Sequence, residues 1–145
     1  YKENDRDAAA SIWVAAWQQT MPDIDFVARR GWIIERLGNR AETGTTTLCG
    51  VSEEGCLLGF VMIEPERHWL EQLAVAPPCF GGGVGAVLLD AAKGLCAGRL
   101  GLRVNQDNPR AVRFYQREGF RIVGEGVNPG GILKTWDMLW MEHGC

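Results

Sequence analysis

The sequence lacks the features that would indicate a membrane, nucleic-acid or metal-binding protein. No apolar run approaches the length of a membrane-spanning helix, and no signal peptide is recognisable. The formal net charge is −3, so no basic field favours nucleic acid or anionic lipid as a partner. The only two histidines, His68 and His143, stand alone. We therefore expect no metal site, no nucleic-acid partner and no membrane partner.

Paired cysteines are also missing. The five cysteines are Cys49, Cys56, Cys79, Cys96 and Cys145, and no two of them form a CxxC pair. An odd, scattered set suits neither a disulfide framework nor a zinc site. Reduced thiols are typical of the cytoplasm, so the expected localisation is cytoplasmic.

The 145 residues suit one domain with a single core. Helical periodicity indicates helices at 5–19, 25–37, 84–96 and 109–118, whereas β-branched or alternating runs indicate strands at 45–51, 56–63, 69–75, 100–104, 121–125 and 134–141. A turn at 128–131 separates the last two strands. This order predicts an α/β or α+β domain, a mixed sheet with helices on its faces.

A glycine cluster stands between the third predicted strand and the third predicted helix. Gly81, Gly82, Gly83 and Gly85 fill four of five positions. Bare backbone N–H groups at a helix start can bind phosphate, and the helix dipole adds partial positive charge there. A flexible turn with close helix packing is the alternative interpretation, and the cluster alone does not decide between them.

Two common phosphate-binding motifs fit this cluster poorly. A P-loop requires Lys-Ser or Lys-Thr after the last glycine, and the sequence has neither. Gly81-x-Gly83-x-x-Ala86 fits the spacing of a dinucleotide fingerprint, with Asp107 as a weak ribose ligand. That fingerprint opens a βαβ unit, however, whereas three antiparallel-looking strands and Pro77-Pro78 precede the glycines here.

Two linked stretches carry a more specific signal. LAVAPPCFGGGVGAVLL and LRVNQDNPRAVRFYQREGF together resemble the GNAT superfamily of N-acetyltransferases, which use acetyl-CoA. The matching residues are Leu73, Ala74, Val75, Pro77, Gly81, Gly83 and Gly85 in the first stretch and Asn108, Ala111, Phe114, Tyr115, Gly119 and Phe120 in the second. Phe80 departs from the family pattern, which has Gln or Arg before the first glycine. The family's first strand is also largely missing, which is consistent with a trimmed N-terminus.

The resemblance implies a fold and a cofactor groove. Residues 1–145 are expected to form a single GNAT-like domain, with a mostly antiparallel mixed sheet, helices on both faces and strands splayed around the CoA groove. The cofactor-binding residues it implies are Leu73, Ala74, Val75, Gly81, Gly82, Gly83, Val84, Gly85, Ala86 and Asn108. The N–H near Val75 would stabilise the oxyanion. Core packing of Leu73 and Val75, and helix capping by Asn108, are compatible additional roles.

Two side chains are candidates for proton transfer. By resemblance, Tyr115 protonates the leaving CoA thiolate as a general acid; local packing is the alternative. Strand alternation places Glu71 on the same face as Leu73 and Val75, toward the groove, which makes it a candidate general base acting directly or through water. A surface carboxylate or an ion pair is the alternative. His68 is a lesser candidate.

Trp13, Trp17 and Met21 lie in the segment that commonly walls the acceptor pocket in this superfamily. Aromatic faces can hold an ammonium group, although core packing of a tryptophan is equally compatible with helical spacing. The leading hypothesis is transfer of an acetyl group from acetyl-CoA to a primary amine of a small molecule or peptide N-terminus. The alternatives are a non-catalytic acyl-CoA-binding regulatory domain and a nucleotide-binding oxidoreductase. The resemblance also allows a homodimer formed through the late strands.

Overall fold

The computed structural model describes residues 1–38, 44–128 and 133–142. The helices are α1 (Arg6–Thr20), α2 (Arg30–Gly38), α4 (Val84–Leu95) and α5 (Pro109–Arg117), with short 3₁₀ turns η1 (Glu3–Asp5), η2 (Val27–Arg29), η3 (Pro65–Arg67) and η4 (Pro77–Cys79). The strands are β1 (Thr46–Val51), β2 (Leu57–Glu64), β3 (Trp69–Val75), β4 (Arg99–Asn105), β5 (Arg121–Val127) and β6 (Lys134–Met141). The predicted element order is confirmed; most of the predicted turn at 128–131 lies outside the described residues.

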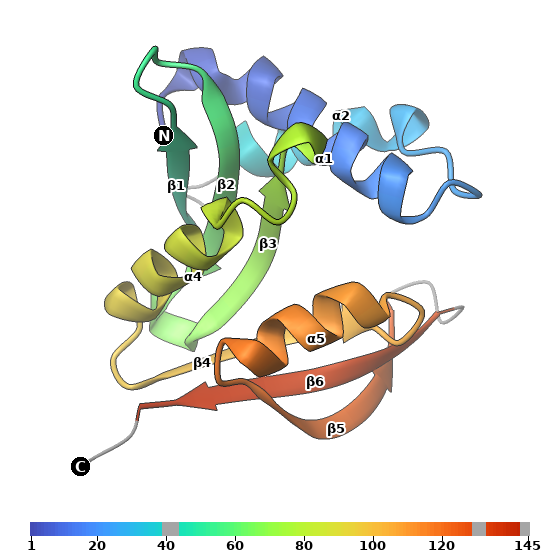
Figure 1. The fold of residues 1–145 in the computed structure, drawn as a ribbon, viewed down its shortest axis with the longest axis vertical. Coiled ribbons are helices and arrows are strands. Elements are labelled where there is room, and N and C mark those ends of the chain that lie inside the picture. Colours follow the sequence, from blue (N-terminus) through green and yellow to red (C-terminus); the bar gives the residue numbers. More distant parts are fainter. Residues whose placement is uncertain (39–43, 129–132, 143–145) are drawn as a thin grey trace.

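The six strands form one sheet in the order β1-β2-β3-β4-β6-β5. Every neighbouring pair is antiparallel except β3 and β4, which run parallel and share a single pair, Trp69 with Gly101. The two strands diverge beyond that pair, which splits the sheet into two halves (Figure 1). The predicted mixed, mostly antiparallel sheet with splayed strands is confirmed. One parallel pair does not make the doubly wound sheet that a dinucleotide-binding fold requires.

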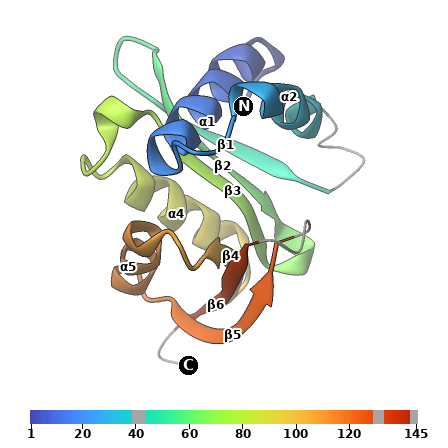
Figure 2. The same ribbon diagram turned by 90° about the vertical axis from the view of Figure 1, so that its right-hand side faces the viewer.

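Helices cover both faces of the sheet, as predicted (Figure 2). Strand β2 shows why, because it is buried on both sides: Phe60 and Met62 pack with α1 and α2, whereas Val61 and Ile63 pack with α4 and α5. Successive strand residues point to opposite faces, so its apolar run joins two separate cores. No helix in the described part of the chain is long and apolar enough to cross a membrane.

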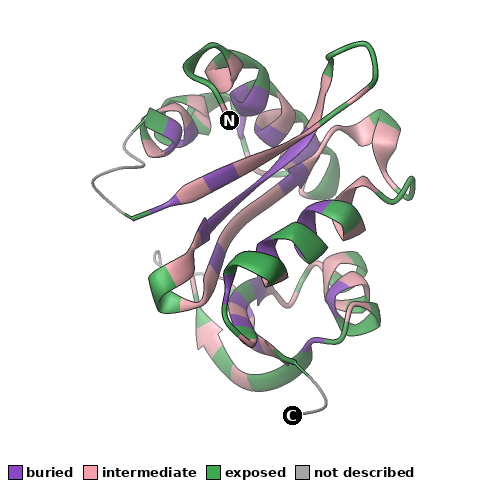
Figure 3. Ribbon diagram, turned by 90° about the vertical axis from the view of Figure 1, so that its left-hand side faces the viewer, coloured by how far each residue is buried: buried purple, intermediate pink, exposed green. Residues whose placement is uncertain are grey.

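The face that α4 turns to the core differs from the face the periodicity predicts. Spacing alone favours Val87, Leu88, Ala91 and Leu95 as buried residues. Leu88 is buried, as predicted, together with Leu89 and Ala92, whereas Ala91 is exposed and Val87 and Leu95 are 69% and 46% exposed. Figure 3 shows buried and exposed residues alternating along this helix. The prediction is wrong for the other three residues because apolar residues occur almost all around this helix. Two different faces of the helix then show the same spacing of three and four residues between apolar positions, and packing against the sheet determines which face is buried.

Strand β3 contains a β-bulge that changes which side chains share a face. Met62 pairs with Gln72 and Ile63 pairs with Leu70, so Glu71 is the extra residue. Leu73 packs on the α4 side and Gln72 bonds Trp13 on the α1 side, but Leu70 lies again in the α4-side core. The bulge has therefore reversed the alternation at Glu71.

Candidate active site

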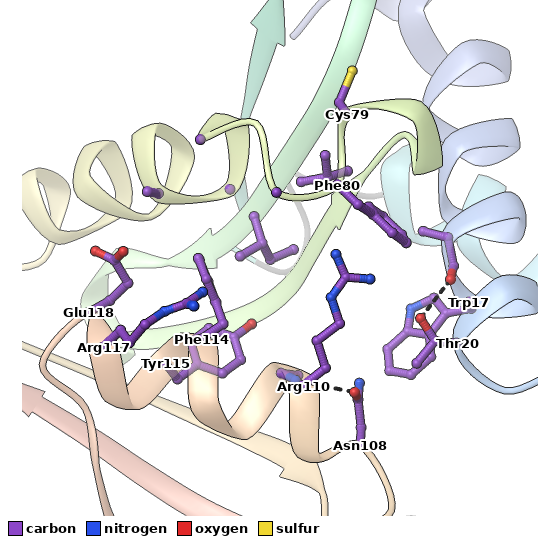
Figure 4. Close-up of a pocket in the computed structure, with 18 residues that line it drawn as sticks. Trp17, Thr20, Cys79, Phe80, Asn108, Arg110, Phe114, Tyr115, Arg117 and Glu118 are labelled. Atoms are coloured by element: carbon purple, nitrogen blue, oxygen red, sulfur yellow. Dashed lines mark hydrogen bonds between the residues drawn. The ribbon is translucent and has the colours of Figure 1, made fainter.

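A hollow lies where β3 and β4 diverge, and we call it the glycine-loop pocket (Figure 4). Its volume is about 510 Å³, within the usual range for ligand sites. It is lined by Ala16, Trp17, Thr20, Leu73, Val75, Cys79, Phe80, Gly81, Gly83, Gly85, Ala86, Asn108, Arg110, Ala111, Phe114, Tyr115, Arg117 and Glu118. The glycine loop, strand β3 and the three helices α1, α4 and α5 thus converge on one hollow.

The glycine loop is held by left-handed backbone. Gly81 has φ +80° and Gly83 has φ +90°, and a Cβ at either position would point into open space. These two glycines are therefore required for conformation, since an L side chain is strained at such angles. Gly83 is the N-cap of α4, whose first N–H groups have no partner inside the helix. The loop delivers these donors to the pocket.

Gly85 has a different purpose. A Cβ there would lie 3.3 Å from Cζ of Phe114 and 3.7 Å from Cγ2 of Val75. Its bare backbone lets α4 approach α5 and the end of β3. For this glycine, close packing is the observed role, whereas phosphate binding by the rest of the cluster stays a prediction.

The edge of β3 that faces the split carries backbone donors. The N–H of Ala76 donates to the carbonyl of Leu58 on β2 at 2.8 Å. Because successive N–H groups alternate between the two edges of a strand, the N–H groups of Val75 and Leu73 point to the opposite edge, toward the gap left by β4. An anionic oxygen in the gap would meet these donors.

Phe80 occupies the position where the family has a long polar side chain. The guanidinium carbon of Arg110, from the first turn of α5, lies 4.3 Å from the centre of the Phe80 ring, and both side chains line the pocket (Figure 4). This is a close cation–π contact. With Arg117 and Glu118, the charged lining consists of two cations and one anion, so the pocket favours an anionic ligand.

Helix α5 presents the remaining polar groups. The side chain of Asn108 accepts from the N–H of Ala111 at 3.2 Å, which makes it the N-cap. Tyr115 is 8% exposed, and burial raises the pKa of its phenol. Its hydroxyl turns into the pocket (Figure 4). A phenol that keeps its proton at neutral pH can act as a proton donor.

Glu71 does not lie where strand alternation predicts. The bulge turns it away from Leu73 and Val75, and its Oε1 forms an ion pair with the Arg36 guanidinium on α2. Glu71 lines neither of the two hollows described here. The prediction of a shared face is wrong, because alternation fails wherever a strand gains a residue.

A second hollow lies on the α1 side of the sheet, and we call it the aromatic pocket. Its volume is about 440 Å³, and it is lined by Trp13, Trp17, Met21, Ile24, Phe26, Arg29, Trp32, Gln72, Asn105, Asn128 and Leu133. Trp17 lines both pockets, and the adjacent β3 residues Gln72 and Leu73 line one pocket each, on opposite faces of the strand. The three predicted acceptor residues, Trp13, Trp17 and Met21, come together here.

Most predicted cofactor residues meet in the glycine-loop pocket. Those outside its lining are Gly82, which is exposed, Val84, which packs on the core, and Ala74, which is buried on the α1 side. The residues that the sequence reasoning missed include Arg110, Arg117 and Glu118. A helical face drawn through Asn108, Ala111 and Tyr115 extends to Glu118, so periodicity could have found part of this set.

The model of the Acetyltransferase (GNAT) family matches residues 6–120. The chain therefore belongs to this family. It is 39% identical over 88 residues to the peptidyl-lysine N-acetyltransferase YiaC of Escherichia coli, covering 61% of this chain and 59% of that protein. It is 33% identical over 114 residues to the streptothricin acetyltransferase of Streptomyces lavendulae, covering 72% and 60%. The chain thus matches less than two thirds of either relative's length.

Among solved structures, the fold resembles the PaiA N-acetyltransferase of Thermoplasma acidophilum in complex with coenzyme A. The TM-score is 0.75 at 16% identity, covering 98% of this chain and 96% of that one. The match confirms the fold expected from the sequence. In the described residues, no group of three or more His, Cys, Asp or Glu side chains is placed to hold a metal ion.

Proposed function

We propose that the protein is an N-acetyltransferase that moves the acetyl group of acetyl-CoA to a primary amine. One observation carries the proposal: a pocket with helix-start donors, strand-edge donors and a buried phenol adjoins a second pocket through Trp17. A cofactor and an acceptor can thus meet at the split between β3 and β4. A regulatory domain that only binds acyl-CoA has no need for the second pocket.

The acetyl-CoA would lie in the glycine-loop pocket. The N–H groups at the start of α4 bind the pyrophosphate, and the helix dipole supports the negative charge. The free edge of β3 at Leu73 and Val75 holds the pantetheine arm. Asn108 keeps its amide N–H group for the cofactor, because only its oxygen is used by the cap.

Arg110 takes over the task of the missing polar residue at position 80. Its guanidinium is the charged group held against Phe80, so the ring fixes a cation at the mouth of the loop. Bidentate donors of this kind bind phosphate oxygens well. The departure from the family pattern therefore moves the cationic contact from the loop to α5.

The chemistry is a direct attack in a ternary complex. The neutral amine nitrogen attacks the thioester carbonyl carbon, and the Val75 N–H stabilises the oxyanion. The C–N bond forms, the C–S bond breaks, and the thiolate takes the phenolic proton of Tyr115. The nitrogen releases its proton to water, and the Tyr115 phenolate takes up a proton from water, which regenerates the enzyme. We assign Glu71 no direct part, because Arg36 holds it on α2's side.

We further propose a cytoplasmic location and no metal requirement, as the scattered cysteines and isolated histidines suggest. A homodimer through the late strands remains a prediction; β5, with β1, forms an edge of the sheet. Such an edge offers free backbone groups for pairing.

The test is calorimetric titration with acetyl-CoA and with NADH. Gly83→Asp should abolish acetyl-CoA binding, because a carboxylate there strains the backbone and repels the pyrophosphate. Gly94→Asp is the matched control, since Gly94 lies near the far end of α4 with open space around it. Failure of the wild type to bind acetyl-CoA, or equal binding by the two variants, would refute the proposal that the glycine loop binds the pyrophosphate.

A further inference from the structure

The aromatic pocket limits the kind of amine that can serve as acceptor. Four of its lining residues are aromatic, and their rings contact one another. Trp13 meets Phe26 edge-on at 5.6 Å between ring centres, Trp17 stacks on Phe26 at 5.7 Å, and Trp32 lies 5.7 Å from Trp13. Rings that pack together lose little freedom when a ligand arrives. They offer a rigid surface to a large apolar group.

The charge of the pocket excludes a strongly cationic ligand. Arg29 is its one charged lining residue within the described chain, and no carboxylate lines it there. The Arg29 guanidinium is exposed, lies 5.5 Å from the Phe26 ring centre and forms no ion pair with a described residue. If the acceptor carried a second ammonium group, that group would lie near the Arg29 cation and have no carboxylate from the described residues to pair with. A carboxylate would meet an unused guanidinium.

A hydrogen-bond donor on β3 adds to this preference. The indole N–H of Trp13 donates to Oε1 of Gln72 at 3.0 Å. An indole nitrogen can only donate, so the orientation of the Gln72 amide is fixed by its partner. The Nε2 group of Gln72 is therefore left as a donor, and a ligand oxygen in the pocket can accept from it.

We propose that the acceptor is an α-amino acid with an aromatic or large aliphatic side chain, and this rests on the proposed function. The aromatic walls take the side chain, and the donors of Arg29 and Gln72 recognise the carboxylate. The primary amine is left to face the split between β3 and β4. Polyamines and other polycations are poor ligands for this pocket.

Binding without acetyl-CoA tests this directly, with the fluorescence of the pocket tryptophans as the signal. The probes are L-phenylalanine, phenethylamine, which lacks the carboxylate, and spermidine. We expect L-phenylalanine to bind about tenfold more tightly than phenethylamine, the worth of one charge-assisted contact, and more tightly than spermidine. Arg29→Gln should reduce that ratio toward one, and the control Arg121→Gln, an exposed β5 arginine outside both pockets, should keep it.

Gln72→Glu provides the opposite test, because it keeps an acceptor oxygen for Trp13 and places a negative charge in the pocket. This variant should bind L-phenylalanine more weakly and spermidine more tightly than the wild type does. Equal binding of the first two probes, or a wild-type preference for spermidine, would overturn the proposal. If L-phenylalanine binds tightly but is not acetylated, the proposed ligand class stands and the proposed transferase activity fails. Failure of this proposal is therefore distinguishable from failure of the proposed function.

Discussion

Replacing Arg110 tests whether the cation stacked on Phe80 binds the cofactor. A charge-assisted contact to phosphate contributes about 1.5–3 kcal/mol when shielded from water. Arg110 is exposed, so solvent and salt reduce this to about 1 kcal/mol. Arg110→Gln should therefore raise the Kd for acetyl-CoA about fivefold.

The assay is calorimetric titration with acetyl-CoA at low and high salt. Arg113→Gln is the matched control, because Arg113 lies on the same helix and is exposed but does not line the pocket. Both variants lose one positive charge, so a difference between them reports position and not net charge. The loss in Arg110→Gln should shrink as salt rises, since screening weakens the wild-type contact.

A double-mutant cycle separates the roles of Phe80 and Arg110. Phe80→Leu removes the ring and should raise the Kd by about two- to fivefold, from a cation–π contribution of about 0.5–1 kcal/mol. In the Arg110→Gln background the same change should have almost no effect, because the ring acts through the guanidinium. Additive effects, or equal losses in Arg110→Gln and Arg113→Gln, would refute the reasoning.

Three further predictions concern the buried groups near the site. Tyr115→Phe should lower kcat about 10²- to 10⁴-fold with an acetyl-CoA Kd within about twofold of wild type, measured by steady-state CoA release, because it removes only the proton donor; an unchanged kcat would exclude that role. Burial raises the pKa of Tyr115 in the folded protein. Below the pKa of about 10 that a tyrosine has in the unfolded chain, the phenol is protonated in the folded and the unfolded protein alike; just above that pH it ionises only in the unfolded protein. The free energy of unfolding should therefore fall above about pH 10, and it should fall less in Tyr115→Phe. Urea titrations at several pH values measure this, and the same pH dependence in the wild type and the variant would contradict it. Glu71→Gln should lower the free energy of unfolding by about 1 kcal/mol, since it breaks a half-buried ion pair, and the loss should vanish in an Arg36→Gln background.

Much of the fold could be predicted from the sequence, because local signals mark the ends of its elements. Pro22 follows the end of α1 closely, Pro77 follows β3, and Asn108 with Pro109 begins α5. Such residues act within a few positions of themselves, so their effect does not depend on the rest of the chain. The family motifs then supplied the topology and the divergence of β3 from β4.

The parts that could not be predicted depend on contacts between distant segments. The bulge at Glu71 is a property of the pairing of β3 with β2, and nothing in the run Leu70-Glu71-Gln72 announces it. The contact of Phe80 with Arg110 joins residues from two different elements. The ambiguity in α4 is of the same kind, because only the sheet beneath it selects a face.

The single pair between Trp69 and Gly101 has a mechanical consequence. A Cβ at Gly101 would lie 3.3 Å from the Trp69 ring. The two half-sheets therefore meet in register at one residue pair, a glycine against an indole. We expect a larger residue at position 101 to change the angle between the two half-sheets, and both pockets would then change width together. The widths of the two pockets would thus depend on one shared angle and could not be changed independently at this position.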